Sequence, residues 1–473
     1  MKVVFIQDIL YEHLGLCYLS AVLKQAGHKV DLVVPSEHKK GSYIDSMRDA
    51  DLALFPVAIS AEKWFLERAK EIKEQLNIPT IFGGPHTTFY PDIVKDPYVD
   101  YIVQGEAEYA LLDLVNALEK GDDVSNILNV GTKEKLNHMR PLIEDIDKIP
   151  FADRELYYSK YKFLRNLPTK RFFGSRGCPR SCTFCYVPSM RKLYRKEDGT
   201  MNGKYLRKRS VQNIIDEIKE VKEKYGIHTV RFSDDTFGWH RPWFNEFMKV
   251  YKKELNLPFT FLFVAGELDE ESIKLLSETK VSSVYFGIES ASEKTRNQLY
   301  TKMVTDSQIR ETARLLRKYN VKFGTYNIVG NPGESLEDAI NTIKINAEIK
   351  TNFPNCSIAQ PYPNTGLYDY ARDNNLLEFQ ENSGKIDFDT MFTGSVLKIQ
   401  DRTQIENLQK FFYIGCKFPF LLPVIRKLIK LPPNPMFKLI FLISYAHRSF
   451  KSFNAGIIDS IKLGFKLRKT LFA

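Results

Sequence analysis

No stretch of this 473-residue chain is uncharged and apolar for the ~18 residues that a membrane-spanning helix needs. The start of the chain also lacks the apolar core of a signal peptide, because only four apolar residues separate Lys2 from Gln7. Cysteine is scarce, and six cysteines in so long a chain do not form a disulfide framework. We therefore expect a protein of the reducing cytoplasm, with a length sufficient for two or three domains.

Three of the six cysteines stand together, at C-x3-C-x2-C spacing, as Cys178, Cys182 and Cys185. Thiolates at this spacing on one tight loop can hold three irons of a [4Fe–4S] cube. No fourth cysteine follows nearby, so the fourth iron would be open to an exogenous ligand. Zinc is the competing metal, although structural zinc sites usually take four ligands as two paired clips.

The segment from Cys178 to Tyr186 resembles the signature of the radical S-adenosylmethionine (SAM) superfamily, C-x3-C-x-aromatic-C. The resemblance implies that the open iron chelates the amino and carboxylate groups of SAM and that Phe184 and Tyr186 lie near the adenine. It also implies reductive cleavage of SAM to a 5′-deoxyadenosyl radical, with a flavodoxin or ferredoxin-type electron donor.

Residues 168–375 alternate short apolar runs with helical periodicity, which is typical of a parallel barrel with its chemistry at the strand carboxyl ends. The expected strands are 229–233, 259–264, 283–287, 323–329 and 356–360, and the expected helices are 211–225, 243–255, 270–277, 307–319 and 335–349. Radical SAM cores are partial barrels of six βα units, and these five strands together with the apolar stretch 171–175 before the cysteines agree with that number.

Polar residues at these strand ends resemble the SAM contacts of the family, although each alone is more often a helix cap or a turn. The implied contacts are Asp234 and Asp235 with the amino group, Glu289 and Ser290 with the ribose and methionine part, and Asn327 and Gly330 beside the adenine. The segment Ala265–Glu267 departs from the pattern, because relatives often carry an arginine there. One contact to the SAM carboxylate is therefore not accounted for.

Residues 1–135 also alternate strands and helices, which predicts a doubly wound parallel sheet with its ligand at the strand carboxyl ends. Glycines and one acid fall at two of these ends, as Gly83, Gly84, Gly105 and Glu106. Glycine lets the backbone approach a large flat ligand closely, but spacing alone favours mere tight turns.

Three short motifs of this region, at 15–20, 83–86 and 104–108, resemble the cobalamin-binding domain that precedes many radical SAM cores. The resemblance implies that Gly83, Gly84, His86, Gly105 and Glu106 contact cobalamin. The Asp-x-His-x-x-Gly loop that supplies a cobalt-ligating histidine in related domains is absent. We therefore expect cobalamin binding without a cobalt–histidine bond, and we interpret His13 and His86 as surface or loop residues.

The last part of the chain, 376–473, is basic and amphipathic. Eleven lysines and arginines follow Cys416, and Asp459 is the only acid after Glu406. This composition favours contact with an anionic membrane at the inner face, and a helical cap over the barrel mouth is the alternative. Nothing resembles a nucleic-acid-binding accessory domain, so we expect no nucleic acid partner.

The expected fold class is α/β: a Rossmann-like cobalamin-binding domain over 1–135, a linker over 136–167, a partial (βα)6 radical SAM core over 168–375 and a mainly helical region over 376–473. The resemblance implies an enzyme with a [4Fe–4S] cluster, SAM and cobalamin as cofactors. C-methylation of a lipid-like or other small molecule is the preferred reaction. Cyclisation or oxidation of the protoporphyrin ester cyclase type is the alternative, and a cobalamin-binding sensor without catalysis is a third hypothesis. The pattern identifies no catalytic residue beyond these cofactor contacts.

Overall fold

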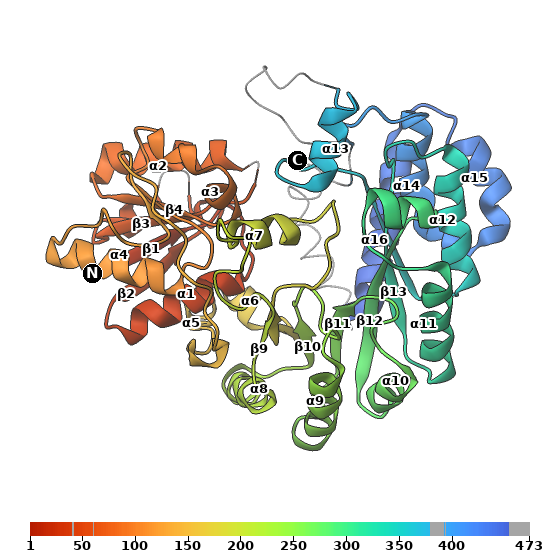
Figure 1. Cartoon of the computed structure of the whole chain (residues 1–473), viewed down its shortest axis with the longest axis horizontal. Helices are drawn as coiled ribbons and strands as arrows, with labels where there is room; N and C mark the ends of the chain where they lie inside the picture. The colour runs from red at the N-terminus through yellow and green to blue at the C-terminus, as the bar shows by residue number, and fades with distance from the viewer. Residues whose placement is uncertain (40–41, 60, 379–391, 393, 454–473) are drawn as a thin grey trace. The chain divides into compact units, whose positions relative to one another are not determined.

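The computed structural model describes residues 1–39, 42–59, 61–378, 392 and 394–453, with only the backbone for 449–453 (Figure 1). The chain forms two compact units. The first comprises Met1–Leu167 and Met190–Arg207, and the second comprises Pro168–Ser189 and the chain from Lys208 on. The segment 136–167, expected as a linker, is grouped with the first unit.

The first unit is built on a six-stranded sheet with strand order β2-β1-β3-β4-β5-β6. The strands are β1 (Lys2–Ile6), β2 (Lys29–Val33), β3 (Leu52–Pro56), β4 (Thr80–Gly83), β5 (Tyr101–Val103) and β6 (Val130–Gly131), and only β6 is antiparallel to its neighbour. The main helices are α1 (Leu14–Gln25), α2 (Glu62–Leu76) and α4 (Glu108–Lys120). This arrangement confirms the predicted doubly wound parallel sheet.

The central strands of this sheet are apolar without alternation, because helices cover both faces of a parallel sheet. Val3–Ile6 and Leu52–Phe55 are fully or almost fully buried. Phe55 packs on Phe82 with ring centroids 4.7 Å apart. The carboxyl ends of β4 and β5 lead into Gly83–Gly84 and Gly105–Glu106, so the predicted ligand positions lie at the same edge of one sheet.

The second unit is built on six parallel strands in the order β14-β13-β12-β11-β10-β7. These strands are β7 (Thr169–Phe172), β10 (Thr229–Phe232), β11 (Phe259–Phe263), β12 (Val281–Glu289), β13 (Phe323–Val329) and β14 (Phe353–Ile358). Between them run α8 (Val211–Tyr225), α9 (Arg241–Glu254), α10 (Glu270–Ser277), α11 (Asp306–Lys318) and α12 (Leu336–Glu348). The order follows the sequence and leaves β7 and β14 as edges, which is a partial (βα)6 barrel.

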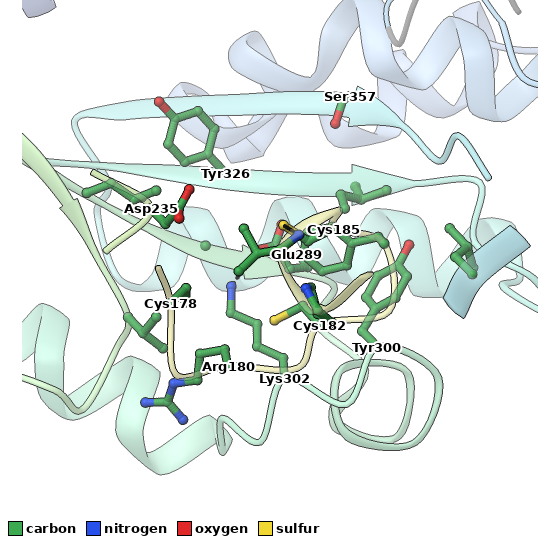
Figure 2. Close-up of a pocket in the computed structure, with 18 of the residues that line it drawn as sticks. Cys178, Arg180, Cys182, Cys185, Asp235, Glu289, Tyr300, Lys302, Tyr326 and Ser357 are labelled. Atoms are coloured by element: carbon green, nitrogen blue, oxygen red, sulfur yellow. Dashed lines mark hydrogen bonds and ion pairs between the residues drawn. The ribbon is translucent and has the colours of Figure 1, made fainter. Parts of the chain in front are cut away.

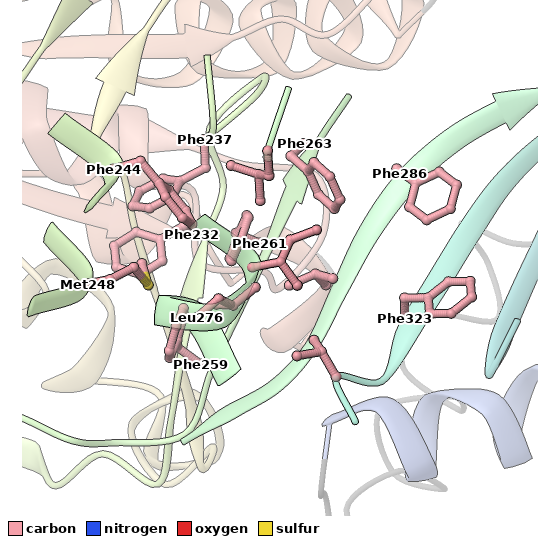
Figure 3. Close-up of a cluster of buried hydrophobic side chains, with 14 of the residues drawn as sticks. Phe232, Phe237, Phe244, Met248, Phe259, Phe261, Phe263, Leu276, Phe286 and Phe323 are labelled. Carbon is pink, nitrogen blue, oxygen red and sulfur yellow. The ribbon is translucent and has the colours of Figure 1, made fainter. Parts of the chain in front are cut away.

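Aromatic side chains fill the layer between these strands and their helices (Figure 3). Phe259, Phe261 and Phe263 alternate along β11 and are all buried, because every second residue of a strand faces the same side. Phe237 is stacked against Phe232 with ring centroids 4.4 Å apart. Leu262, between Phe261 and Phe263, faces the other side of the sheet and lines the cavity described below.

The C-terminal helices belong to the second unit and pack on its barrel helices and edge strand. They are α13 (Gly366–Asp373), α14 (Arg402–Lys417), α15 (Leu422–Leu428) and α16 (Pro435–Phe453). Phe411 and Phe412 of α14 are buried in one cluster with Ile340 and Ile343 of α12. The Gln409 amide donates to the Cys356 carbonyl of edge strand β14 (3.0 Å). Within the described residues, no helix has the length and apolar character to cross a membrane.

Candidate functional site

A cavity of about 500 Å³ opens where strands β10 to β14 end. Cys178, Cys182 and Cys185 all line it, on the loop that follows the short strand β8 (Ser175–Arg176) (Figure 2). The structure therefore brings the three cysteines of the motif to the carboxyl ends of the barrel strands, where barrel enzymes carry their chemistry.

Thr183 fixes the loop that carries the three cysteines. Its backbone N–H donates to the Tyr300 carbonyl (3.0 Å) and its hydroxyl donates to the Leu299 carbonyl (2.7 Å). Its own carbonyl accepts from the Leu367 N–H (2.8 Å), and a Cβ on Gly366 would come within 3.1 Å of the Thr183 side chain. The loop is thus held by two other segments of the unit, as a ligand loop must be if its thiols are to keep one geometry.

Burial keeps the three thiols protonated in the absence of a cation. It raises the pKa of Cys178 to about 12 and that of Cys182 to about 11, and it raises the pKa of Cys185 as well. The carboxylates of Asp235 and Glu289 add to these shifts. A bound metal reverses this preference, because its positive charge stabilises the thiolates.

The three thiols of the motif line one cavity, apart from the other three cysteines. In the part of the chain that the structure describes, no three side chains of His, Cys, Asp or Glu converge on a single ion position. The thiols instead line one cavity, as a cube with several irons requires. Cys17, Cys356 and Cys416 are buried elsewhere and do not line this cavity.

The adjacent carboxylates Asp234 and Asp235 have different environments. Asp234 is buried and accepts hydrogen bonds from the Gly174 N–H (3.0 Å) and the Ser175 hydroxyl (2.5 Å), while burial raises its pKa to about 7. Asp235 is exposed into the cavity, and the surrounding protein raises its pKa through desolvation. Asp234 therefore supports the base of the cysteine loop, whereas Asp235 lines the cavity.

Glu289 forms an ion pair with Lys302 inside the cavity, and the two side chains are 8% and 6% exposed (Figure 2). Glu289 has φ of 63°, a left-handed backbone that is uncommon for a non-glycine residue and that marks functional sites. The absence of a side chain at Gly287 leaves room for this pair, because a Cβ there would displace the Glu289 carboxylate and the Lys302 amine.

Lys302 is a cavity residue that the sequence analysis missed. The expected arginine position, Ala265–Glu267, is instead a closed turn: Glu267 accepts from the Val264 N–H (2.9 Å) and the Thr236 hydroxyl (2.7 Å). The cations that line the cavity are Lys302 and Arg180, and Arg180 also lies 3.5 Å from Glu267.

The aromatic residues of the site divide into two groups. Phe184 lines the cavity and meets the ring of Tyr300 edge to face at 4.8 Å. The buried Tyr300 hydroxyl donates to the Asn331 side chain. Tyr186 does not line the cavity. Its ring lies 6.0 Å from the ring of Tyr362, and Tyr362 does line the cavity.

Three further predicted SAM contacts lie in different settings. Asn327 lines the cavity and is also bonded to Asn346 of α12 (2.7 Å). Ser290 and Gly330 are outside the set of lining residues. The Ser290 carbonyl accepts from the buried Arg296 (2.7 Å), and a Cβ on Gly330 would meet Ile399. Ser290 thus serves the turn after β12, and Gly330 packs against the segment that leads to α14.

In the first unit, the predicted cobalamin residues of β5 contact the segment 190–207. The Gly105 backbone has φ of 64° and lies against Tyr194 and Met139, so a Cβ has no room there. The Glu106 N–H donates to the Tyr194 hydroxyl (2.8 Å) and the Glu106 carboxylate accepts from Arg207 (2.8 Å). Glu106 therefore holds this segment on the sheet.

At the end of β4, Gly84 has φ of 98°, and a Cβ there would come within 2.9 Å of the Val57 carbonyl oxygen. The interpretation of His86 as a surface or loop residue is wrong, because it is buried in the short helix α3 (Pro85–Phe89), with Nδ1 3.6 Å from Glu62 and its ring 5.0 Å from that of Tyr90. Desolvation lowers the His86 pKa, and the Glu62 charge opposes that shift. The imidazole is thus directed at residues of its own unit.

Two family models match the chain. Residues 173–345 match the radical SAM superfamily and residues 10–115 match the B12 binding domain. The chain belongs to the B12-binding radical SAM family. This radical SAM protein is therefore an enzyme, and its cofactors are a [4Fe–4S] cluster, SAM and cobalamin, as predicted. The predicted fold class is confirmed as well.

Relatives of this radical SAM enzyme are named for more than one reaction. It is 32% identical to an uncharacterized methyltransferase of Pyrococcus horikoshii, over 65% of this chain and 66% of the relative. It is 26% identical to the anaerobic magnesium-protoporphyrin IX monomethyl ester cyclase of Rubrivivax gelatinosus, over 75% of this chain and 65% of the relative. The chain thus spans about two thirds of the length of these curated relatives.

Among solved structures, the radical SAM enzyme is similar in fold to OxsB, a cobalamin-dependent S-adenosylmethionine radical enzyme with aqua-cobalamin and S-adenosylmethionine bound. The TM-score is 0.66 at 17% identity, and the match covers 100% of this chain and 75% of OxsB.

Proposed function

We propose that the enzyme transfers a methyl group to an unactivated carbon of a small, lipid-like substrate. The observation that carries this proposal is the composition of the cavity. Its wall combines three cysteines and one ligand-facing carboxylate with an apolar side that includes Leu262, Ile328 and Ile358. Apolar walls exclude water and accept a hydrocarbon, as a reaction at an unactivated carbon needs.

When bound, the cluster, SAM and cobalamin supply the electron, the radical and the methyl group of such a reaction. The protein supplies position. In this proposal Cys178, Cys182 and Cys185 hold three irons, and the Thr183 contacts keep the loop in place. Phe184, supported by Tyr300, offers its ring to the adenine.

Two charged groups would orient the amino-acid part of SAM. Asp235, directed into the cavity, accepts hydrogen bonds from the ammonium, since a carboxylate is the natural partner of that group. Lys302 meets the carboxylate and so replaces the arginine that the Ala265–Glu267 turn lacks. Its pairing with Glu289 in the ligand-free protein prevents an unpaired charge in the cavity until SAM arrives.

For cobalamin, the proposed contacts are the backbone at Gly83, Gly84 and Gly105, at one edge of the first sheet. Glu106 and His86 contribute by shaping this edge, because their side chains are already bonded within the unit. No imidazole of the protein is proposed on cobalt.

The alternative reaction is cyclisation or oxidation, and the cyclase of Rubrivivax gelatinosus among the relatives supports it. The two reactions differ in the fate of the SAM methyl group. The electron donor in either case is proposed to be a flavodoxin or ferredoxin-type protein.

The test is an anaerobic incubation of the reconstituted enzyme with an extract of lipids and small metabolites. The mixture also contains a reductant and SAM whose methyl group is deuterated. Methylation predicts a product that carries the deuterated methyl, whereas cyclisation or oxidation predicts a product that has lost hydrogen and carries no label. The Cys178→Ala, Cys182→Ala, Cys185→Ala triple variant is the control and should give neither. A product without label would reject methylation.

A further inference from the structure

Exposed apolar side chains are concentrated in one short part of the described chain. Eight of the thirteen exposed large hydrophobic side chains among the described residues lie between positions 418 and 443. Phe420 is 74% exposed, Ile443 60% and Met436 57%. We call the exposed apolar side chains of 418–443, together with the exposed Lys427, Lys430 and Lys438, the tail surface. These side chains lie on α15, on the residues beside it and on α16, and we take their concentration in so short a stretch as the sign of an interaction site.

Helix α16 is apolar on two sides, which a helix with one side in water does not require. Phe437 and Phe441 are buried, and Phe437 meets Phe411 of α14 with ring centroids 4.8 Å apart. Met436, Leu439 and Ile443 follow each other at three- and four-residue spacing and are all exposed. The buried side attaches α16 to the rest of the enzyme. The apolar character of the exposed side is not explained by any packing within the described residues.

The lysines and arginines of this region also form two groups, one with contacts inside the second unit and one exposed. Arg426 pairs with Glu337 (2.5 Å), Lys417 donates to the Thr351 carbonyl (2.6 Å), and Arg448 lies 4.7 Å from the Tyr445 ring centroid. These three cations stabilise the second unit. The three lysines of the tail surface are exposed instead, and no acidic residue occurs between Glu406 and Asp459.

We propose that the tail surface docks the enzyme on an anionic membrane, with the helices lying in the interface rather than crossing it. Apolar side chains interleaved with lysines and without acids match an anionic lipid surface. The charge pattern disfavours two other occupants. A second copy of the chain would present the same lysines, so the two surfaces would repel each other. Residues 454–473 contain four lysines or arginines and one acid, so they too carry a net positive charge that the lysines of the tail surface repel. Membrane docking does not depend on which reaction the enzyme catalyses. The lipid-like nature of the substrate, in contrast, belongs to the proposed methylation.

The test is flotation of the full-length protein with phosphatidylglycerol–phosphatidylcholine vesicles, without substrate. Each lysine at an anionic surface is worth roughly a fivefold change in partitioning, so the Lys427→Gln, Lys430→Gln, Lys438→Gln variant should bind roughly a hundredfold more weakly. The matched control is Lys222→Gln, Lys249→Gln, Lys253→Gln on α8 and α9, which removes the same charge from exposed positions and should bind normally.

The apolar part has its own variant, Phe420→Ser, Met436→Ser, Ile443→Ser. It should lose the binding that remains at high salt, because burial of apolar side chains is not screened by ions. Leu128→Ser, Leu136→Ser, at exposed sites of the first unit, is the control. Both tail variants should cleave SAM in solution at the normal rate, so a defect in flotation is separable from a defect in chemistry.

Three results would overturn the proposal. The first is equal flotation of both tail variants and the unchanged protein. The second is loss of flotation on removal of residues 454–473 with the tail surface intact, which would assign the binding to those residues. The third is a dimer, measured by light scattering, that the apolar variant dissociates while neither protein floats, which would assign the surface to a second copy.

Discussion

Lys302 and Glu289 form a buried ion pair inside the cavity that holds the three cysteines. Neither residue belongs to the cysteine loop, and Lys302 lies on the irregular turn between β12 and α11. The pair places one positive and one negative group next to the proposed SAM site in a protein whose Ala265–Glu267 turn provides no cation. Lys302 is therefore the residue whose substitution tests the site most directly.

The Lys302→Met variant should bind SAM at least tenfold more weakly, because the proposed partner of the SAM carboxylate is gone. It should also lose about 3–5 kcal/mol of stability, since it leaves Glu289 buried without its cation. Calorimetric titration of the cluster-reconstituted protein with SAM measures the first effect, and thermal unfolding measures the second.

The double variant Glu289→Gln, Lys302→Met separates these two effects. It removes the unpaired carboxylate and should recover most of the stability, while SAM affinity stays low. Recovery of both stability and affinity in the double variant would show that Lys302 only neutralises Glu289.

The cysteine triple variant Cys178→Ala, Cys182→Ala, Cys185→Ala should hold no [4Fe–4S] cluster after anaerobic reconstitution, because the cavity then lacks all three thiols. Iron and sulfide analysis with visible absorption gives the measurement. Cys17→Ser, Cys356→Ser and Cys416→Ser are matched controls, since these thiols are buried outside the cavity, and their iron content should be unchanged. A cluster retained in the triple variant contradicts the assignment.

Cobalamin should bind without a nitrogen of the protein on cobalt, because His86 is turned toward Glu62 and Tyr90 and the Asp-x-His-x-x-Gly loop is absent. Paramagnetic resonance of the cob(II)alamin form in the whole protein, with all histidines labelled with ¹⁵N, is the measurement. A superhyperfine coupling from a labelled nitrogen would refute the prediction.

Glu334 should make stability fall as pH rises from about 4.5 to about 7. Burial raises its pKa to about 7, although the Gly330 and Asn331 N–H groups donate to it. In this window the folded chain keeps a proton that the unfolded chain has released, so the folded state loses relative stability with increasing pH. The free energy of unfolding should fall by at most about 4 kcal/mol across this window.

The Glu334→Gln variant should remove this component of the pH dependence, measured as denaturant unfolding between pH 4.5 and 7.5. Glu337→Gln is the control, because hydrogen bonds from Lys344 and Arg426 lower the pKa of Glu337, so that this carboxylate is ionised throughout the window and its removal should leave the pH dependence unchanged. An unchanged pH profile in Glu334→Gln means that this carboxyl titrates normally.

The elements of both units follow from local sequence signals. Fully apolar strands such as Val3–Ile6 predict a parallel sheet, and Ser210 and Gly226 predict the ends of α8, where the Ser210 hydroxyl does accept from the Asn213 N–H (3.2 Å). The spacing of the cysteines likewise predicts one loop. These features depend on neighbours in the sequence, which is why they are readable without coordinates.

The finer roles within the site depend on side-chain direction and could not be predicted in the same way. Asp234 and Asp235 are adjacent, yet one supports the loop and the other lines the cavity. Lys302 lies between Thr301 and Met303, which have φ of 47° and 56°, and no periodic pattern describes such a turn. Ser290 and Gly330 stand beside true lining residues but belong to packing.

The assignment of 190–207 to the first unit, while the chain on either side belongs to the second, has a consequence for dissecting the enzyme. A single proteolytic cut cannot release either unit as one continuous polypeptide. A gene fragment ending near residue 135 would encode a sheet without Tyr194 and Arg207, so Glu106 would lose both of its partners from that segment. The two units are therefore expected to be inherited, expressed and transplanted only together.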